Sequence, residues 1–499
     1  MAPQVANLLG SSPYAMAHFA IPVWTEALHP SRVAIARRIR HGHLGSGTSR
    51  AAAITISKIR GSIVMSSITS GVEASDRKQV IAGRRAVVAA SVGNALEWYD
   101  FIIYALFAVY IAQNFFPGGD QSTELVKAFI AFGLGFIIRP LGAVLIGVYA
   151  DRAGRKAALT LTIMIMALGT LVIAAAPTYA AIGIGAPLLL LVGRMLQGFS
   201  AGGELGGAAA FLVEHAPEGK KGKYASWLQG SMAISNILAA LVAFSVTALL
   251  TQQQIGEWGW RLPFLVGLLI APVGIWMRRT LDETPHFREE IARQNKSGVT
   301  ERLPLKAAFV EFWRELLKGT GMCVLWGVST YTLVIFMPIY IQRSFGMSGS
   351  DTFLASLIGN VFMLISCVVA GSLSDVVGRK KMLVVAAIIL ATAVHPLLWL
   401  LHMSSTLPTL IFVQTAFCIM VGLYVGVAPS ALSEIFPTRV RSTGMSLAYN
   451  TATTIFGGFA PAILTWLSQG GGIYAPAWYM TAAAACALLA IATLKRPVG

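Results

Sequence analysis

The feature that most limits how this chain can fold is a series of apolar segments that begins near residue 86. Crossing a hydrocarbon core about 30 Å thick takes roughly 20 consecutive apolar residues in a helix. Because lipid offers no partner to backbone N–H and C=O groups, each segment must be helical. The predicted fold class is therefore all-α, a polytopic membrane protein with twelve transmembrane helices. The segments lie at about 86–112, 125–149, 157–177, 186–212, 224–250, 261–277, 319–342, 353–373, 382–402, 407–432, 442–468 and 476–494.

Lys and Arg are distributed unequally between alternate loops. Positive charges near segment ends remain on the cytoplasmic side, so the basic loops predict both termini to be cytoplasmic. The opposite loops hold few, with Arg261 and Arg343 at segment edges. This asymmetry also explains the net charge of +16 without nucleic acid as a partner. The basic loop residues are Arg152, Arg155, Lys156, Lys220, Lys221, Lys223, Arg379, Lys380, Lys381, Arg439 and Arg441.

An internal repeat divides the chain into two halves. GVYADRAGRKA at 147–157 reappears as GSLSDVVGRKK at 371–381, and FLVEHAPEGKKGKYAS at 211–226 aligns with ALSEIFPTRVRSTGMS at 431–446. Such repeats are typical of transporters that hold one site between two rocking bundles. The predicted organisation is an N-terminal cytoplasmic segment, a six-helix bundle, a cytoplasmic linker and a second six-helix bundle, at 1–85, 86–277, 278–318 and 319–494. Residues 1–64 are interpreted as a mis-assigned extension upstream of Met65, or as a transit-like presequence.

Charged side chains inside the segments are candidates for function, because each costs about 2.5 to 3.5 kcal/mol to insert. All of them fall in the first half. At 100° per residue, those of the first segment share one face with Tyr104, and those of the fourth share one with Gln197. The charged positions are Glu97, Asp100, Arg139, Arg194 and Glu204.

Two roles are predicted for these residues. Arg139 or Arg194 would receive a substrate carboxylate in a bidentate fork, with Gln197 and Tyr104 as further substrate contacts. One of the carboxylates of Glu97, Asp100 and Glu204 would carry a coupling proton, and the sequence leaves open which one. The alternative is that the opposite charges pair to hold the helices together.

The second half has no carboxylate or arginine deep in a segment, so we expect it to shape the site. Its isolated polar residues include His395, for which a hydrogen-bonded helix contact is the simpler interpretation. Glycines of the fourth segment, including Gly198 and Gly202, predict close helix packing. The repeated loops predict charge pairs that form in one conformation and break in another. The predicted gating residues are Asp151, Arg155, Asp375, Arg379, Glu214, Glu434 and Arg441.

No cofactor, metal or hydrolysed nucleotide is expected. The four cysteines stand singly in apolar stretches, and no GxxxxGK[ST] loop is present in the sequence. Uphill transport would then draw on an ion gradient. The expected partners are a small organic acid, protons and membrane lipid, and we expect the chain to act as a monomer.

Several motifs in this sequence resemble those of the major facilitator superfamily, and within it those of the metabolite:proton symporters. The resemblance covers residues 86–494. GVYADRAGRK and GSLSDVVGRK match the superfamily's cytoplasmic loop motif, and RMLQGFSAG matches its fourth-helix motif, which implies a part in proton coupling for Arg194 and Gln197. LDETPHF is similar to the acidic element after the sixth helix. GNALEWYDF, GFIIRPLGA, GEWGWRLPF and FPTRVRSTGMSLAYNTATTIFGG are similar to the symporter subfamily, and QGFSAGGELGG is similar to citrate and tricarballylate symporters.

The resemblance implies a secondary active transporter rather than an enzyme, with proton symport of a di- or tricarboxylate such as citrate. A zwitterionic osmolyte such as proline or betaine, or an aromatic acid such as shikimate, is the alternative substrate. A uniporter or exchanger is the alternative mechanism, and a non-transporting membrane sensor is a more remote one.

Overall fold

The structure is a computed structural model that describes residues 94–95, 97–153, 155–202, 204–214, 216–280, 311–437, 440–469 and 472–494. The predicted N-terminal segment, the LDETPHF element and most of the predicted linker lie outside these residues. The side chains of Asp151, Arg155 and Glu204 are also outside the described set.

Each of the first six predicted segments contains helix. The first consists of residues 97–106 and, after a turn at Phe107, α4. The second and fourth are each built from two consecutive helices. Short helices α8 (Tyr179–Ile182) and α12 (Gln252–Glu257) lie in the connections. The helices of this half are α4 (Ala108–Phe115), α5 (Gln121–Ile137), α6 (Arg139–Ala153), α7 (Arg155–Ala175), α9 (Gly185–Ala201), α10 (Glu204–Glu214), α11 (Lys221–Leu249) and α13 (Leu262–Thr280).

The six predicted segments of the second half are helical as well. Two of them contain π-helical stretches, η2 (Thr330–Phe336) and η4 (Thr453–Gly458). Such stretches often occur at functional sites. The helices are α16 (Trp313–Ser329), α17 (Met337–Phe345), α18 (Gly349–Val377), α19 (Arg379–Met403), α20 (Leu407–Val425), α21 (Ala428–Ile435), α22 (Arg441–Ala452), α23 (Ala460–Ser468) and α24 (Ala475–Ala492).

The outer surface of these helices is apolar. Leu269, Trp478 and Leu489 are 75%, 65% and 73% exposed. Seven helical spans within the described residues are long and apolar enough to cross a membrane. An apolar surface this extensive is unfavourable in water, so it faces lipid.

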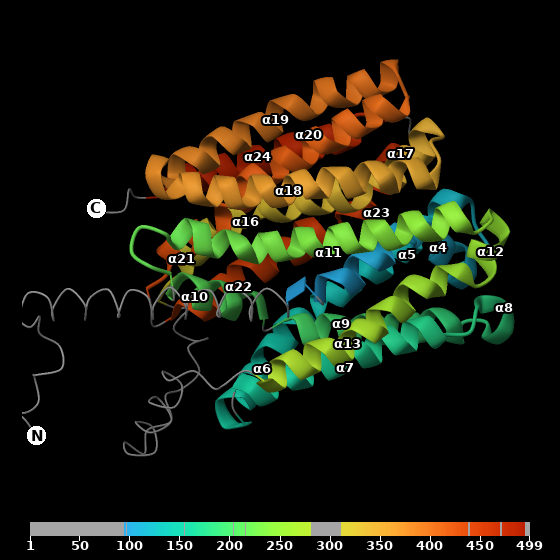
Figure 1. Cartoon of the computed structure of the whole chain (residues 1–499), viewed down its shortest axis with the longest axis horizontal. Coiled ribbons are helices and arrows are strands. Elements are labelled where there is room, and N and C mark those ends of the chain that lie inside the picture. Colours follow the sequence, from blue (N-terminus) through green and yellow to red (C-terminus); the bar gives the residue numbers. More distant parts are fainter. Residues whose placement is uncertain are drawn as a thin grey trace, which may run out of the picture. The chain divides into compact units, whose positions relative to one another are not determined.

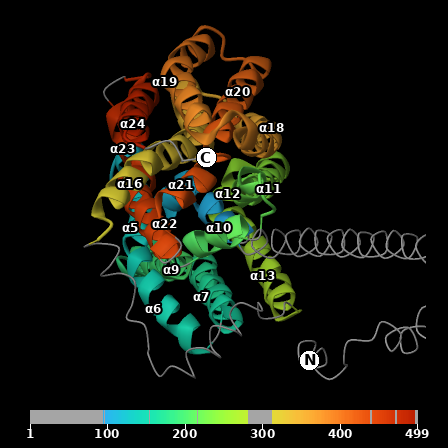
Figure 2. The same cartoon turned by 90° about the vertical axis from the view of Figure 1, so that its left-hand side faces the viewer.

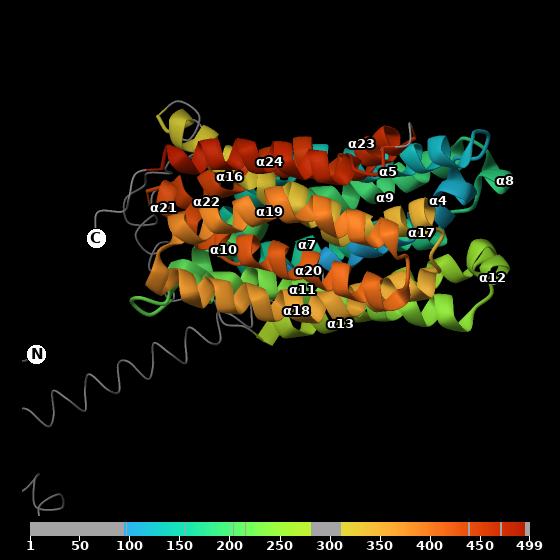
Figure 3. The same ribbon diagram turned by 90° about the horizontal axis from the view of Figure 1, so that it is seen from above.

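The two halves form two bundles that lie against each other. In Figure 1 most of the second half, with α16 to α20, α23 and α24, lies above the first, whereas α21 and α22 lie beside α10. Figure 2 shows a similar division in a view along the helices. Contacts between the bundles join α11 to α18, α5 to α23 and α10 to α22. Figure 3 shows α10, α21 and α22 gathered at one end of the molecule and α8, α12 and α17 at the other. The first of these ends carries the loops with Lys220, Lys221, Arg379 and Lys380, and we call it the basic end.

Glycines allow α9 to pack closely on α5 and α6. A Cβ atom on Gly198 would lie 1.7 Å from the Gly135 carbonyl oxygen, and one on Gly202 would lie 1.9 Å from that of Arg139. Both values are far below a van der Waals contact, so no larger residue fits without backbone movement. The predicted packing role of these two glycines is confirmed. The close approach places Arg139 and Arg194 on neighbouring helices.

We expect Gly198→Ala to destabilise the protein, because the added methyl group forces α5 and α9 apart, at a cost of about 1–3 kcal/mol. Thermal unfolding of the detergent-solubilised protein measures this. Gly207→Ala is the control, since its Cβ would meet the Ser442 Oγ at an ordinary 3.9 Å. Equal midpoints for the two variants would contradict this account of the packing.

Candidate functional site

Arg194 on α9 is fully buried and lies among aromatic rings. Its guanidinium carbon is 4.7 Å from the ring centre of Phe101, 4.5 Å from that of Tyr104 and 4.7 Å from that of Phe132. Its Nη2 donates to the Phe132 carbonyl at 3.4 Å. Aromatic faces attract cations, so these rings replace part of the hydration that Arg194 lacks. The Tyr104 hydroxyl donates to the Ala128 carbonyl at 3.0 Å, which fixes this ring beneath Arg194.

A chain of hydrogen bonds joins Arg194 to Asp100 across three helices. Arg194 Nη1 donates to Gln197 Oε1 at 2.7 Å, and Gln197 Nε2 donates to Thr170 Oγ1 at 2.9 Å. Thr170 Oγ1 lies 2.5 Å from Asp100 Oδ2. All four side chains are buried. Arg194 and Gln197, two residues of the predicted polar face of the fourth segment, are thus connected to a carboxylate of the first segment. We call these four residues the relay.

Arg139, at the start of α6, is also buried, but its contacts differ from those of Arg194. Its guanidinium carbon lies 4.0 Å from the ring centre of Phe136 and 4.6 Å from that of Phe101. Its Nε and Nη2 have no hydrogen-bond partner among the described residues. These two nitrogens form one edge of the guanidinium, the edge that can bind both oxygens of a carboxylate.

The second bundle contributes Tyr331, from the π-helical stretch η2. Its ring centre is 5.4 Å from that of Phe136 and 5.9 Å from that of Trp98, and its hydroxyl has no partner in the described part of the chain. Tyr331 lies within electrostatic range of Arg139, Arg194 and Glu97. The aromatic residues and the two arginines therefore form one cluster between the bundles, which we call the central cluster.

Glycines of η4 leave room for two aromatic rings of the central cluster. A Cβ atom on Gly457 would lie 2.8 Å from Tyr331 Cδ2, and one on Gly458 would lie 2.8 Å from Phe136 Cγ. The Thr454 hydroxyl in the same stretch donates to the Phe136 carbonyl at 3.2 Å. The two π-helical stretches of the second half thus contact residues of the first half.

Of the remaining candidates from the sequence, the structure describes the side chains of some but not of others. Glu97 is half-buried near Tyr331, one turn before Asp100. Glu204 begins α10, but its side chain is outside the described residues, as are those of Asp151 and Arg155. The assignments of Glu97, Glu204, Asp151 and Arg155 stay predictions. His395 lies 4.8 Å, between ring centres, from Trp478 on α24. Its buried Nε2 has no hydrogen-bond partner among the described residues, so at this nitrogen the structure does not show the expected hydrogen-bonded helix contact.

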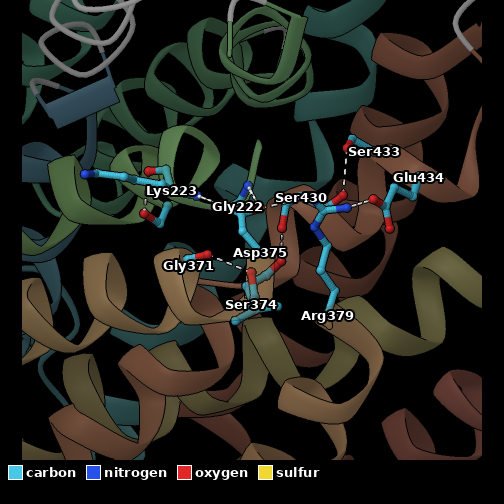
Figure 4. Close-up of polar contacts among 11 residues, drawn as sticks. Gly222, Lys223, Gly371, Ser374, Asp375, Arg379, Ser430, Ser433 and Glu434 are labelled. Atoms are coloured by element: carbon cyan, nitrogen blue, oxygen red, sulfur yellow. Dashed lines mark hydrogen bonds and ion pairs between the residues drawn. The ribbon is translucent and has the colours of Figure 1, made fainter. Parts of the chain in front are cut away.

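At the basic end, Asp375 of α18 caps a helix of the other bundle (Figure 4). Its Oδ1 accepts from the Gly222 N–H at 2.7 Å and its Oδ2 accepts from the Lys223 N–H at 3.0 Å. These N–H groups belong to the first turn of α11, whose own N-cap residue, Lys220, makes no side-chain cap. An anion at a helix N-terminus is favoured by both hydrogen bonding and the helix dipole.

Ion pairs extend this contact. Arg379 pairs with Asp375 at 3.2 Å and also with Glu434 of α21, as Figure 4 shows. A separate pair joins the bundles, with Arg441 Nη1 at 3.3 Å from Glu214 Oε1. We call these five residues, with the first turn of α11, the basic-end latch. The sequence named all five, and the structure brings them into these contacts.

The opposite end also has a polar contact between the bundles. Arg343 of α17 donates to the Ser122 hydroxyl of α5 at 2.7 Å. Asp120 caps α5 and lies within electrostatic range of Arg343. Hydrogen bonds from the Thr123 side chain and from backbone N–H groups hold the pKa of the Asp120 carboxyl below its ordinary value.

A further contact between the bundles lies midway along α11 and α18, where the Asn236 amide donates to Asn360 Oδ1 at 2.9 Å. The bundles are therefore in contact at both ends and at the centre.

Sequence reasoning missed Thr170 and assigned no role to Tyr331. Thr170 is an uncharged residue in an apolar segment, so a search for intramembrane charge passes over it. Its position directly after Gly169 was the available signal, because a hydroxyl beside a close helix contact is well placed for a bond between helices.

Comparison with known proteins shows the family to which the chain belongs. The sugar (and other) transporter family matches residues 86–495. A citrate-proton symporter of Klebsiella pneumoniae is 38% identical over 412 residues, covering 82% of this chain and 91% of the relative. The glycine betaine/proline/ectoine/pipecolic acid transporter OusA of Dickeya dadantii is 35% identical over 416 residues, covering 81% of this chain and 82% of the relative.

A solved structure shows the same fold. It is that of the major facilitator superfamily proton:xylose symporter XylE, known from E. coli, with a TM-score of 0.64 and 18% identity over 82% of this chain and 94% of the other. The chain belongs to the sugar (and other) transporter family, with the major facilitator fold of twelve transmembrane helices in two six-helix bundles. It is a multi-pass membrane transporter, and this family is not one of enzymes.

We expect Asp375→Ala to lower the free energy of unfolding by about 1 kcal/mol, because α11 loses the cap on its first turn. Thermal unfolding in detergent measures the change. Glu218→Ala, which removes an exposed acid from the loop before α11, is the matched control and should leave the midpoint nearly unchanged. If the two variants unfold at the same temperature, the capping role assigned to Asp375 is wrong.

Proposed function

We propose that this protein is a proton-coupled symporter that carries a small organic acid across the cytoplasmic membrane of a bacterium, with citrate or another di- or tricarboxylate as the first candidate. The observation that carries the proposal is the unpaired edge of Arg139. A buried arginine with two free donors is costly, because unpaired buried donors lose their hydration without compensation. A carboxylate of the substrate would supply the missing acceptors.

The environment of Arg139 suits an anion better than a neutral solute. Phe101 and Phe136 hold the guanidinium plane, so its Nε and Nη2 edge is preorganised for a planar, bidentate partner. A neutral solute would leave the arginine charge unpaired. The Tyr331 hydroxyl, which has no partner among the described residues, is a second donor for an acid that also carries a hydroxyl group.

The two arginines then have different roles. Arg139 receives the substrate, whereas Arg194, already bonded to Gln197 and the Phe132 carbonyl, belongs to the proton-handling part with Asp100. Asp100 is 5% exposed and its Oδ1 has no partner in the described region, so this oxygen can accept a proton. Gln197 and Tyr104 support Arg194 rather than touching the substrate. Glu97 and Glu204 remain further candidates for the coupling proton.

The two relatives named above support different substrates, citrate and betaine or proline. A quaternary ammonium group binds to free aromatic faces. Here Phe101, Phe132, Phe136 and Tyr104 already lie against guanidinium groups. The protein's own cations thus lie against these four rings, which favours an acid anion over a zwitterion at this position.

We also propose that the basic-end latch is the cytoplasmic gate. With the basic end inside, both chain ends are cytoplasmic and Arg343 with Ser122 lies outside. The protein would then act as a monomer in which the bundles of residues 86–277 and 319–494 move relative to each other. The contacts at one end would break while those at the other end remain. Asp151 and Arg155 would act in the same gate through the repeated motif.

The test of this function is uptake into proteoliposomes containing the purified protein. We expect labelled citrate to accumulate when the outside is more acidic, and the accumulation to end when a protonophore collapses the gradient. A competition panel of unlabelled tricarballylate, succinate, shikimate, proline and betaine identifies the substrate class. Uptake unaffected by the protonophore would refute proton coupling, and competition by betaine alone would refute the acid assignment.

We expect Arg139→Ala to weaken apparent substrate affinity about 100-fold, because two charge-assisted hydrogen bonds are lost. Arg139→Lys should recover only part of this, since an ammonium group cannot form the bidentate fork. Binding to the purified protein and initial uptake rates measure the effect. Arg314→Ala, at an exposed position of α16, is the matched control. Unchanged affinity in Arg139→Ala would exclude this residue as the carboxylate receptor.

A further inference from the structure

We propose that Thr170 is the positioning residue that links the protonation state of Asp100 to Arg194. This inference rests on the proposed proton symport. Thr170 lies on α7, away from the charged residues in sequence, yet it is the side chain that touches both the carboxylate of the first segment and the glutamine of α9.

Close helix packing fixes the position of Thr170. A Cβ atom on Gly169 would lie 2.7 Å from the Gly193 carbonyl oxygen and 2.9 Å from Gln197 Cγ. The absence of a side chain at Gly169 lets α7 approach α9 until the Thr170 hydroxyl reaches the Gln197 amide. Gly267 of α13 has a similar effect on the other side, because its Cβ would lie 2.5 Å from Asp100 Oδ1.

The direction of each hydrogen bond follows from the donors available. The Arg194 guanidinium can only donate, and an ionised Asp100 can only accept. Gln197 therefore accepts with Oε1 and donates with Nε2, and Thr170 accepts from Gln197 and donates its single hydroxyl hydrogen to Asp100. Every donor in the relay points from the cation to the anion, which makes the bonds reinforce one another.

Thr170 has a second acceptor for the same hydrogen. Its Oγ1 lies 3.1 Å from the Met166 carbonyl oxygen, one turn earlier on α7. The hydroxyl has one hydrogen and serves one of these acceptors at a time. The ionised carboxylate wins, since charge-assisted bonds are about twice as strong as neutral ones.

Protonation of Asp100 removes this advantage. A proton bound at Oδ1, the oxygen without a partner in the described residues, forms an O–H bond and neutralises the carboxyl group. The Thr170 hydroxyl can then turn to the Met166 carbonyl by rotation about one bond. The relay loses its head-to-tail order, and Arg194 loses the anion to which it was linked. Proton binding at Asp100 is thus transmitted to Arg194 in the central cluster.

A purely structural role for Thr170 makes a different prediction, so the test separates coupling from stability. Counterflow exchange of labelled for unlabelled citrate requires no net proton movement, whereas uphill accumulation does. We expect Thr170→Val, which keeps the side-chain shape, to retain counterflow within about threefold of wild type but to accumulate citrate only to the outside concentration. Thr170→Ser should retain both activities.

Three results would overturn the proposal. The first is wild-type accumulation by Thr170→Val, and the second is a proportional loss of counterflow and accumulation in that variant. If Thr170→Val does not fold, Thr170→Cys, a weaker donor of similar size, should still accumulate less than Thr170→Ser, and equal accumulation is the third. Wild-type uptake that does not depend on the proton gradient would instead refute the proposed symport, whatever the results for the variants. If the panel selects betaine, labelled betaine replaces citrate.

Discussion

Two arginine side chains buried in the membrane interior determine how the rest of this protein is arranged. Neither can be hydrated, and each must be stabilised by what the neighbouring helices provide. For Arg194 these are three aromatic rings, a backbone carbonyl and the relay to Asp100. For Arg139 they are two phenylalanine faces and, in the proposed cycle, the substrate. The glycine contacts among α5, α6, α7 and α9 follow from this need, because the helices must approach closely for such short side-chain bonds to form.

The second bundle meets these charges with aromatic and small residues instead of counter-charges. Tyr331 comes from η2, and the glycines that accommodate it and Phe136 come from η4. A π-helical stretch shifts the side chains that follow it relative to a regular α-helix, and such stretches are frequent at functional sites. This suits a surface that has to fit a solute in one conformation and separate from the first bundle in another.

Polar contacts also join the two bundles at both ends of the molecule, away from the charged centre. Asp375 caps α11 across the boundary between the bundles, and Arg343 reaches Ser122 at the other end. Each is a modest, partly exposed polar contact, of the strength that can break and re-form during a transport cycle. The closely packed glycines beside the relay belong to one bundle and would move together with it.

The amino-acid sequence by itself determined the class of fold, because membrane-length apolar segments can only be helices and the repeat fixes two halves of six. It also named Asp100, Arg139 and Arg194 as candidates, since charge inside a membrane is rare enough to be recognised. Gln197 was named because it shares a helix face with Arg194, and the acids and arginines of the basic-end latch were named from the repeated loops. Only the tertiary structure decided how these residues are paired. Thr170 and Tyr331 carry no charge and lie far along the chain from their partners. Their contacts depend on which glycine lets which helices approach, and helical periodicity within one segment does not contain that information.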